Sequence, residues 1–165
     1  MSVRAFVSGY QSLSNKLKSP VTLKYRDLET QVDALWDTGA TGTCISKEVV
    51  TALSLIPLGK QQIHTPVGLS TVNTYQIDIL LPNKVLVSDV IVRDSEIGDQ
   101  GLGVLIGMDI INLGDFAVSS FNKQTVFTFR IPSQKKTDYV AELRLKNAIG
   151  PIHGKGRRKG SKKKK

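Results

Sequence analysis

The 165-residue sequence has one cysteine, Cys44, and no long apolar run. A single cysteine excludes an intrachain disulfide. No stretch is apolar for long enough to cross a bilayer as a helix. The first 20 residues contain three basic residues but no continuous apolar segment, so they do not resemble a secretory signal. These absences favour a cytoplasmic protein without a membrane span.

Acidic residues are missing from the C-terminus, where basic residues accumulate. Residues 151–165 hold eight of the 23 basic residues, which leaves 15 basic and 14 acidic residues in positions 1–150. The tail has no apolar residue after Ile152, so it cannot bury enough surface to fold alone. We expect a nearly neutral body followed by a disordered basic tail. The tail can be a solubilising end, or residues 155–165 can contact nucleic-acid phosphates without reading bases.

Alternating apolar and polar residues dominate the body, and Gly, Pro, Asn or Asp separate the runs, as is typical of strands. The expected strands lie at Val21–Tyr25, Val32–Trp36, Tyr75–Leu81, Val85–Val92, Val104–Ile106 and Phe127–Ile131. Helical signals are few, and they predict helices at residues 47–53 after an N-cap at Ser46, at Met108–Leu113, and between Ser133 and Asn147. The sequence therefore predicts a mostly β domain.

A carboxylate follows the second expected strand, in the segment Trp36-Asp37-Thr38-Gly39-Ala40-Thr41. At the end of a strand, in a tight loop, Asp37 would be held rigidly, and Gly39 would let another backbone approach closely. The same residues also suit a simple turn in which the aspartate accepts hydrogen bonds from backbone amides. The segment alone leaves both interpretations open.

A second pattern lies about 70 residues later, where the apolar run Val104-Leu105-Ile106 leads into Gly107-Met108-Asp109. Asp-Thr-Gly-Ala after one strand, followed by this later run, resembles the retroviral-type (retropepsin-like) aspartic proteases over residues 15–132. The resemblance implies a single-domain, cellular or bacterial member with an all-β, closed and compact barrel, one or two short helices and a flap hairpin. The remaining parts are an N-terminal segment, 1–14, a C-terminal extension with helical spacing, 133–150, and the basic tail, 151–165.

The resemblance implies a role for each residue of the first motif. Asp37 is the catalytic carboxylate, and Thr38 joins the two catalytic loops across a dimer. Gly39 and Ala40 present backbone to a bound peptide. These roles predict an aspartic endopeptidase.

The resemblance also implies roles for later residues. Gly107 lets the second strand pass beneath the catalytic loop, and Asp109 is structural, for example as a cap of the short helix. The flap tip is expected at His64–Thr71, with Val67, Gly68 and Leu69 toward the substrate. Cys44 is expected to be a small buried hydrophobe rather than a reactive thiol.

Peptide hydrolysis by carboxylates needs two of them around one water, sharing one proton. The chain has one Asp-Thr-Gly and no internal repeat, so we expect a homodimer that supplies Asp37 twice and acts on a protein or peptide substrate. No cofactor is expected, and one cysteine and two histidines are too few for a metal site.

Two positions depart from the viral pattern. Viral members often pair an arginine after the glycine of the second motif with an acid shortly after Asp-Thr-Gly-Ala, and here these places hold Met108 and Thr41. The missing ion pair leaves an alternative, a catalytically weak retropepsin-like module that binds peptides or dimerises and whose basic tail contacts nucleic acid.

Overall fold

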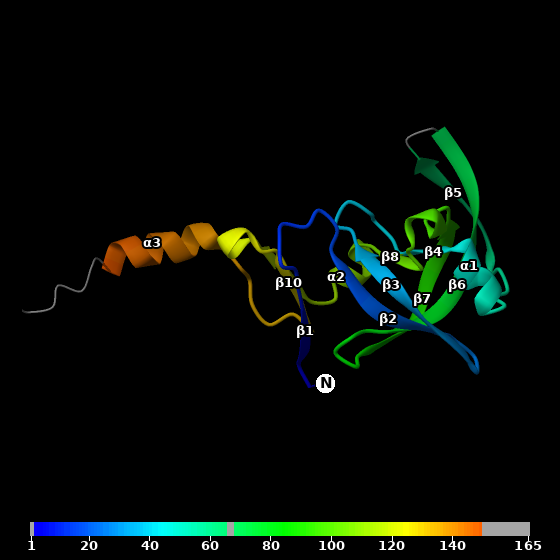
Figure 1. Cartoon of the computed structure of the whole chain (residues 1–165), viewed down its shortest axis with the longest axis horizontal. Helices are drawn as coiled ribbons and strands as arrows, with labels where there is room; N and C mark the ends of the chain where they lie inside the picture. Colours follow the sequence, from blue (N-terminus) through cyan, green and yellow to red (C-terminus); the bar gives the residue numbers. More distant parts are fainter. Residues whose placement is uncertain (1, 66–67, 150–165) are drawn as a thin grey trace, which may run out of the picture. The chain divides into compact units, whose positions relative to one another are not determined.

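The computed structural model describes residues 2–65 and 68–149, and the chain divides into two units, Met1–Gln134 and Lys135–Lys165 (Figure 1). The strands of the first unit, in the described residues, are β1 (Arg4–Gly9), β2 (Lys18–Tyr25), β3 (Leu28–Trp36), β4 (Cys44–Ser46), β5 (Gly59–Thr65), β6 (Gly68–Leu80), β7 (Leu86–Ser95), β8 (Val104–Ile106), β9 (Asp115–Ser119) and β10 (Val126–Ile131). Its helices are α1 (Lys47–Ala52), α2 (Met108–Ile111) and the 3₁₀ turns Gly98–Gln100 and Phe121–Lys123.

Six strands close into a barrel. They pair in the order β2-β3-β8-β4-β7-β6, and β6 pairs again with β2, which completes the ring. β3 and β8 run parallel with Trp36 opposite Ile106, whereas β4 is antiparallel to β8. The predicted closed β-barrel with short helices is therefore confirmed, and Ser46 caps α1 by accepting a hydrogen bond from the Val49 N–H at 3.3 Å.

The period-two pattern places one set of side chains inside the barrel. Leu23, Ile45, Ile79, Val92 and Ile106 are fully buried. Each such aliphatic side chain contributes about 1.5–3 kcal/mol when it leaves water. The barrel is thus held mainly by apolar packing, and this packing fixes the ends of β3 and β8.

A second sheet, β1-β10-β9, packs aromatic residues against Trp36. The rings of Phe6, Phe116, Phe127 and Phe129 lie 5.0–6.0 Å from the Trp36 ring, centroid to centroid. The Trp36 indole N–H donates to Ser19 Oγ at 2.9 Å. The sequence analysis treats residues 1–14 as an N-terminal segment outside the domain. In the structure, β1 belongs to the same unit as the barrel, because it pairs with β10 along its whole length.

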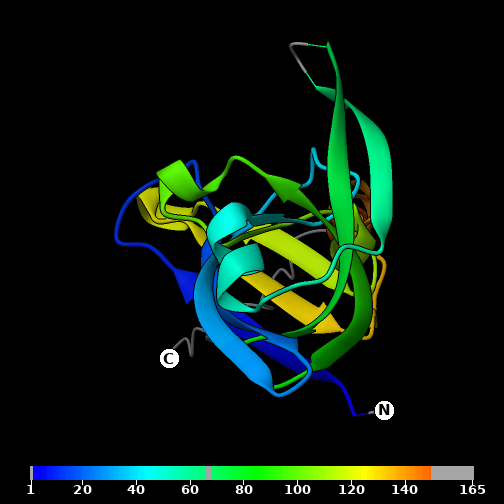
Figure 2. The same cartoon turned by 90° about the vertical axis from the view of Figure 1, so that its right-hand side faces the viewer.

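A long hairpin, β5–β6, projects from the first unit (Figure 2). Its register runs from Gly59 opposite Thr74 to Thr65 opposite Gly68. The predicted flap hairpin is therefore present. Positions 66–67, which join the strands and include Val67, lie outside the described residues.

The second unit contains α3 (Tyr139–Ile149). The Asp138 carboxylate accepts a hydrogen bond from the Ala141 N–H at 3.0 Å, so the helix begins later than the predicted Ser133. In the part of the chain that the structure describes, no helix is long and apolar enough to cross a membrane. The tail expected to be disordered lies outside the described residues.

Candidate active site

Asp37 lies directly after β3, at the edge where β3 and β8 end together. Its N–H donates to Ile106 O at 3.0 Å, which continues the pairing of the two strands by one residue. Its Oδ1 accepts from the Gly39 N–H at 2.8 Å, and its carbonyl accepts from the Ala40 N–H at 3.3 Å. The residue therefore forms a turn and also presents a half-buried carboxylate at the barrel edge.

Gly107 lies where the second motif passes against the loop after Asp37. A Cβ atom added at Gly107 would lie 2.7 Å from the Gly42 carbonyl carbon and 3.0 Å from Ala40 O. Both are backbone atoms, so no side chain fits there. The neighbouring Met108 N–H donates to the same Ala40 oxygen at 2.8 Å, and the two motifs are joined backbone to backbone.

Asp109 accepts hydrogen bonds from Thr43, a fully buried residue of the loop. The Thr43 N–H lies 2.9 Å from Asp109 Oδ2, and the Thr43 hydroxyl lies 2.8 Å from Oδ1. The same hydroxyl accepts from the Gly107 N–H at 3.2 Å. The N-cap of α2 is Gly107, which makes no side-chain hydrogen bond. Asp109 therefore does not act as the N-cap. It secures the loop of residues 37–43, called the active-site loop below because it carries the candidate catalytic Asp37.

The remaining residues of the first motif face outward. Thr38 and Gly39 are exposed and Ala40 is partly exposed. At the places of the viral ion pair, Thr41 is exposed and Met108 packs against the hydrophobic core. Asp37 is thus the one carboxylate of this loop, because residues 38–43 contain no other acid.

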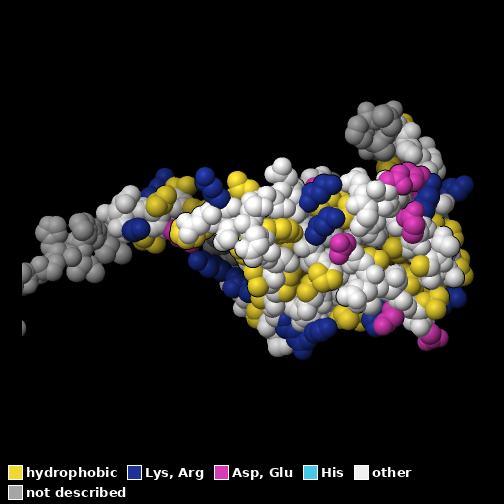
Figure 3. Space-filling model, viewed as in Figure 1, with side chains coloured by type: hydrophobic (Ala, Val, Ile, Leu, Met, Phe, Trp, Pro, Cys, Tyr) yellow, Lys and Arg dark blue, Asp and Glu magenta, His cyan; other side chains and the backbone are white. Residues whose placement is uncertain are grey.

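Two hollows lie between the active-site loop and the flap. One, of about 580 Å³, is lined by residues 39–42, Cys44, Gln61–Ile63 and Arg93–Ser95. The other, of about 520 Å³, is lined by Lys47, Ile63, Leu69–Val72 and Asp94–Glu96. They share Ile63, Asp94 and Ser95, so they adjoin each other, and together they are called the groove. Acidic and basic side chains lie together close to the base of the hairpin (Figure 3).

Cys44 lines this groove and is partly exposed. Burial raises the pKa of its thiol, while a hydrogen bond with Ser95 and the charge of Arg93 act to lower it. At neutral pH the residue is a protonated thiol, which is a weak nucleophile.

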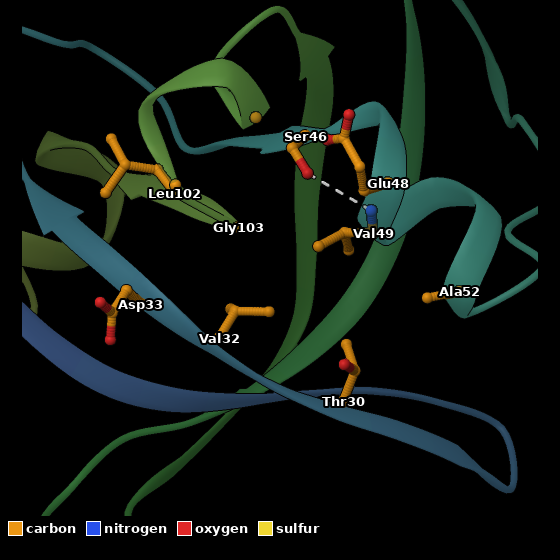
Figure 4. A pocket seen from close by; sticks show the side chains of 11 residues that line it. Thr30, Val32, Asp33, Ser46, Glu48, Val49, Ala52, Leu102 and Gly103 are labelled. Carbon is orange, nitrogen blue, oxygen red and sulfur yellow. Dashed lines mark hydrogen bonds between the residues drawn. The ribbon is translucent and has the colours of Figure 1, made fainter.

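A third hollow, of about 290 Å³, lies under α1 and does not include Asp37 (Figure 4). Its lining holds two carboxylates, Asp33 and Glu48, which lie on opposite sides of the hollow (Figure 4). Neither residue lines the groove beside the active-site loop. This hollow therefore does not supply a second carboxylate for Asp37.

Among the described residues, no three His, Cys, Asp or Glu side chains are grouped so that they could hold a metal ion. The structure places Asp37, Thr38, Gly39, Ala40, Gly107 and Asp109 around one loop, and Gly68 and Leu69 on the flap strand β6. Sequence reasoning missed Thr43 and Arg93. The partners Thr43 and Asp109 are 66 residues apart, and no local pattern indicates such a pair.

The comparisons with known proteins agree with this geometry. Residues 28–112 match the family model described as gag-polyprotein putative aspartyl protease. Because the match covers half of the chain, the protein belongs to this family of retropepsin-like aspartic proteases. A search of the curated proteins found no significant match.

Several solved structures are similar to the chain. A retropepsin-like aspartic protease from Rickettsia conorii is 11% identical, with 79% of this chain and 97% of that chain covered and a TM-score of 0.48. Simian foamy virus (mac) protease is 21% identical, with 55% and 89% covered and a TM-score of 0.41. A Legionella pneumophila protein of unknown function is 16% identical, with 59% and 87% covered and a TM-score of 0.36.

Proposed function

We propose that the protein is a homodimeric aspartic endopeptidase in which each subunit supplies Asp37. The observation that carries the proposal is a single carboxylate at the joined ends of β3 and β8, on a loop fixed by Gly107, Thr43 and Asp109. A loop held in this way keeps a carboxylate in one geometry, as acid–base chemistry requires.

The chemistry needs the second copy. Two carboxylates close together cannot both ionise, so the pair holds one shared proton. The ionised member takes a proton from water, and the protonated member donates to the carbonyl oxygen of the peptide bond. The protons belong to the pair, so the pH profile reports two apparent pKa values for the dyad.

The dimer contact is proposed at the active-site loop and the adjoining β1-β10-β9 sheet. Thr38 is exposed beside Asp37, and Trp36, the preceding residue, packs on the aromatic face of this sheet. Within the described residues, β1 and β9 each pair with β10 alone, so each leaves one strand edge available. Both edges carry exposed valines, Val7 at 67% and Val118 at 45%. A Val7→Lys protein is expected to be monomeric in equilibrium sedimentation and inactive.

The substrate is proposed to lie in the groove between the loop and the flap as an extended strand. Backbone of residues 39–42 forms one wall, and Gln61–Ile63 of β5 forms the other. Main-chain pairing of this kind accepts many sequences, and pockets for alternate side chains set the preference. Gly68 and Leu69 of the flap, with Val67 between the strands, are proposed to close over the peptide.

The decisive test is the Asp37→Asn protein. It should fold and dimerise like the parent, because asparagine has the same shape and keeps an oxygen acceptor for the Gly39 N–H. It should lose all cleavage of a peptide library between acidic and neutral pH. Cleavage by the mutant at the parental rate would refute the assignment, as would a strictly monomeric parent at micromolar concentration.

A second candidate, a weakly catalytic binding module with a nucleic-acid-contacting tail, is favoured by the eight basic residues of 151–165 and by the absence of the viral ion pair at Thr41 and Met108. A chain truncated after residue 150 would then lose salt-dependent RNA binding. Unchanged RNA binding by the truncated chain would exclude this role of the tail. Contact of the tail with nucleic acid is compatible with either function, because the tail lies outside the family match, whereas robust cleavage by the parent would exclude the weakly catalytic module.

A further inference from the structure

The groove beside Asp37 contains one cation, Arg93, without an ion-pair partner among the described residues. Its Nε donates to Gln61 Oε1 of the flap strand β5 at 2.7 Å. None of the ion pairs in the described part of the chain involves this guanidinium. Arg93 is half-buried as a residue, and the hydrogen bond of its guanidinium with Gln61 is exposed, so a ligand in the groove can reach this group. An arginine in this state has two terminal nitrogens ready for an acceptor brought by a ligand.

The other charged residues lining the groove are engaged. Lys47 forms an ion pair with Glu96. Asp94 accepts hydrogen bonds from Asn73, from its N–H at 2.8 Å and from its side-chain amide at 3.2 Å. The acid next to Arg93 in sequence is thus joined to the flap strand β6 and not to the guanidinium.

The guanidinium lies directly on the active-site loop. A Cβ atom added at Gly42 would lie 2.4 Å from Arg93 Nη1 and 3.3 Å from its Cζ. The absence of a side chain at Gly42 therefore makes the room that Arg93 occupies. Arg93 and Asp37 also act in opposite directions on the pKa of the Cys44 thiol, so both charges lie near this residue.

We propose that Arg93 is a specificity-determining residue that binds the carboxylate of an aspartate or glutamate side chain of the substrate, close to the scissile bond. A guanidinium forms two parallel hydrogen bonds with a carboxylate, and the geometry of this fork favours an acid over a neutral amide. The inference rests on the proposed function. Two-fold symmetry then supplies one Arg93 on each side of the scissile bond, so the preference for acids is expected on both sides.

A structural role is the competing explanation, because Arg93 also joins β7 to the flap through Gln61. The two roles differ in what they change. Loss of a flap anchor weakens all substrates equally, whereas loss of a carboxylate-binding group weakens only acidic ones. The informative quantity is therefore the ratio between an acidic and a neutral ligand of the same shape.

The experiment uses peptides that contain statine, a mimic of the tetrahedral intermediate. In each pair of peptides, Glu replaces Gln at one of the first three residues on either side of the statine. Binding is measured by fluorescence anisotropy for the full chain, Arg93→Gln, Arg93→Glu and the control Arg26→Gln. Arg26 lies between β2 and β3 and does not line the groove, so the control removes the same charge elsewhere.

The parent and the control should bind a Glu peptide roughly tenfold to a hundredfold more tightly than its Gln partner at one position on each side. Arg93→Gln should abolish this ratio, and Arg93→Glu should favour a peptide with Lys at that position. An unchanged ratio in Arg93→Gln, or an equal loss of affinity for both peptides, overturns the inference while leaving the protease assignment intact. Failure of the parent to bind any statine peptide, together with the absence of cleavage, overturns both.

Discussion

The active-site loop and the flap hairpin form opposite walls of one groove, but they are held in different ways. Hydrogen bonds join the loop to β8 and α2 at three places: Asp37 to Ile106, Ala40 to Met108, and Thr43 to Asp109. Two of these are backbone pairs, and the third uses a buried threonine. The loop is therefore fixed to the barrel at both of its ends, although Thr38, Gly39 and Thr41 are exposed.

The flap is held mainly by its own ladder. From Gly59 to Thr65, β5 pairs with β6 and with no other strand among the residues that the structure describes. Further hydrogen bonds join the hairpin to β7: the Asn73 N–H donates to Asp94, and Arg93 donates to Gln61. Leu69 of the flap is 65% exposed. Segments with few buried contacts open at low free-energy cost. The comparison indicates one wall that is fixed to the barrel and one that opens at low free-energy cost, which suits the proposed chemistry at the loop and the proposed entry of a peptide under the flap.

Adding one methyl group at Gly107 is the most damaging change expected. A Cβ there would lie within 3.0 Å of backbone atoms of Gly42 and Ala40, and backbone cannot move aside cheaply. We expect Gly107→Ala to lower the free energy of unfolding by about 3 kcal/mol and to abolish cleavage. Urea denaturation and a peptide-cleavage assay measure both effects. Gly9→Ala, where the nearest atom is 4.0 Å away, is the matched control and should be close to neutral.

Removal of the Thr43 hydroxyl should have the next largest effect. Valine has the same shape, but it leaves the Gly107 N–H without its acceptor and removes one of the two hydrogen bonds to Asp109 Oδ1, which keeps only the bond from the Ile110 N–H. The expected loss in the free energy of unfolding is about 2 kcal/mol, because both groups lie in a buried or partly buried place. Thr43→Ser keeps the hydroxyl and should retain most of the stability and activity. Equal behaviour of the two variants would mean that these bonds do not hold the loop.

A methyl group at Gly68, on the flap hairpin, should affect cleavage more than it affects the stability of the fold. Its φ of +125° is unfavourable for a residue with a Cβ, although no atom lies within 4 Å of the added group. The strain, about 1–2 kcal/mol, falls on the hairpin alone. We expect kcat/KM to fall several-fold, whereas the free energy of unfolding of the barrel falls by no more than about 1–2 kcal/mol, because the hairpin can relieve the strain by opening locally. Gly59→Ala, on the same hairpin with its nearest contact at 3.9 Å, should change neither. Global destabilisation by Gly68→Ala would break the contrast between the two walls.

The sequence predicts the active-site loop and the strands that hold it better than it predicts the flap hairpin. Alternation identifies β2, β3 and β10, and a wholly apolar run identifies β8, because each places long apolar side chains in one core. The motif at Asp37 depends on local turn chemistry, which is readable in a few residues. By contrast, β5 is the polar run Gly-Lys-Gln-Gln-Ile-His-Thr, and β4 has three residues. A strand whose partner is another exposed strand carries no apolar alternation, so its register follows only from the fold.

Contacts between distant residues are the second reason for the difference. Arg93 lies in β7, one residue beyond the strand expected at Val85–Val92, and no local pattern marks it as a site residue. Its position against Gly42 depends on the parallel pairing of β4 with β7, which sets Cys44 opposite Arg93. The motif residues after Asp37 could be read from the sequence, but the charge in the groove beside them could not.

Cys44 lies between the two walls, so the rate of its alkylation should report on how well they cover the groove. Burial raises its thiol pKa, so at pH 8 the thiolate fraction is below that of an ordinary cysteine. Iodoacetamide should therefore react at least about tenfold more slowly with the folded chain than with the urea-unfolded chain. Arg93→Gln removes a charge that lowers this pKa, so the pH midpoint of the reaction should move further upward. Because the sequence has one cysteine, mass spectrometry follows the site without ambiguity. A folded chain that reacts as fast as the unfolded one would show that the flap leaves the groove open. The flap would then not act as a wall of the groove, and only the loop would.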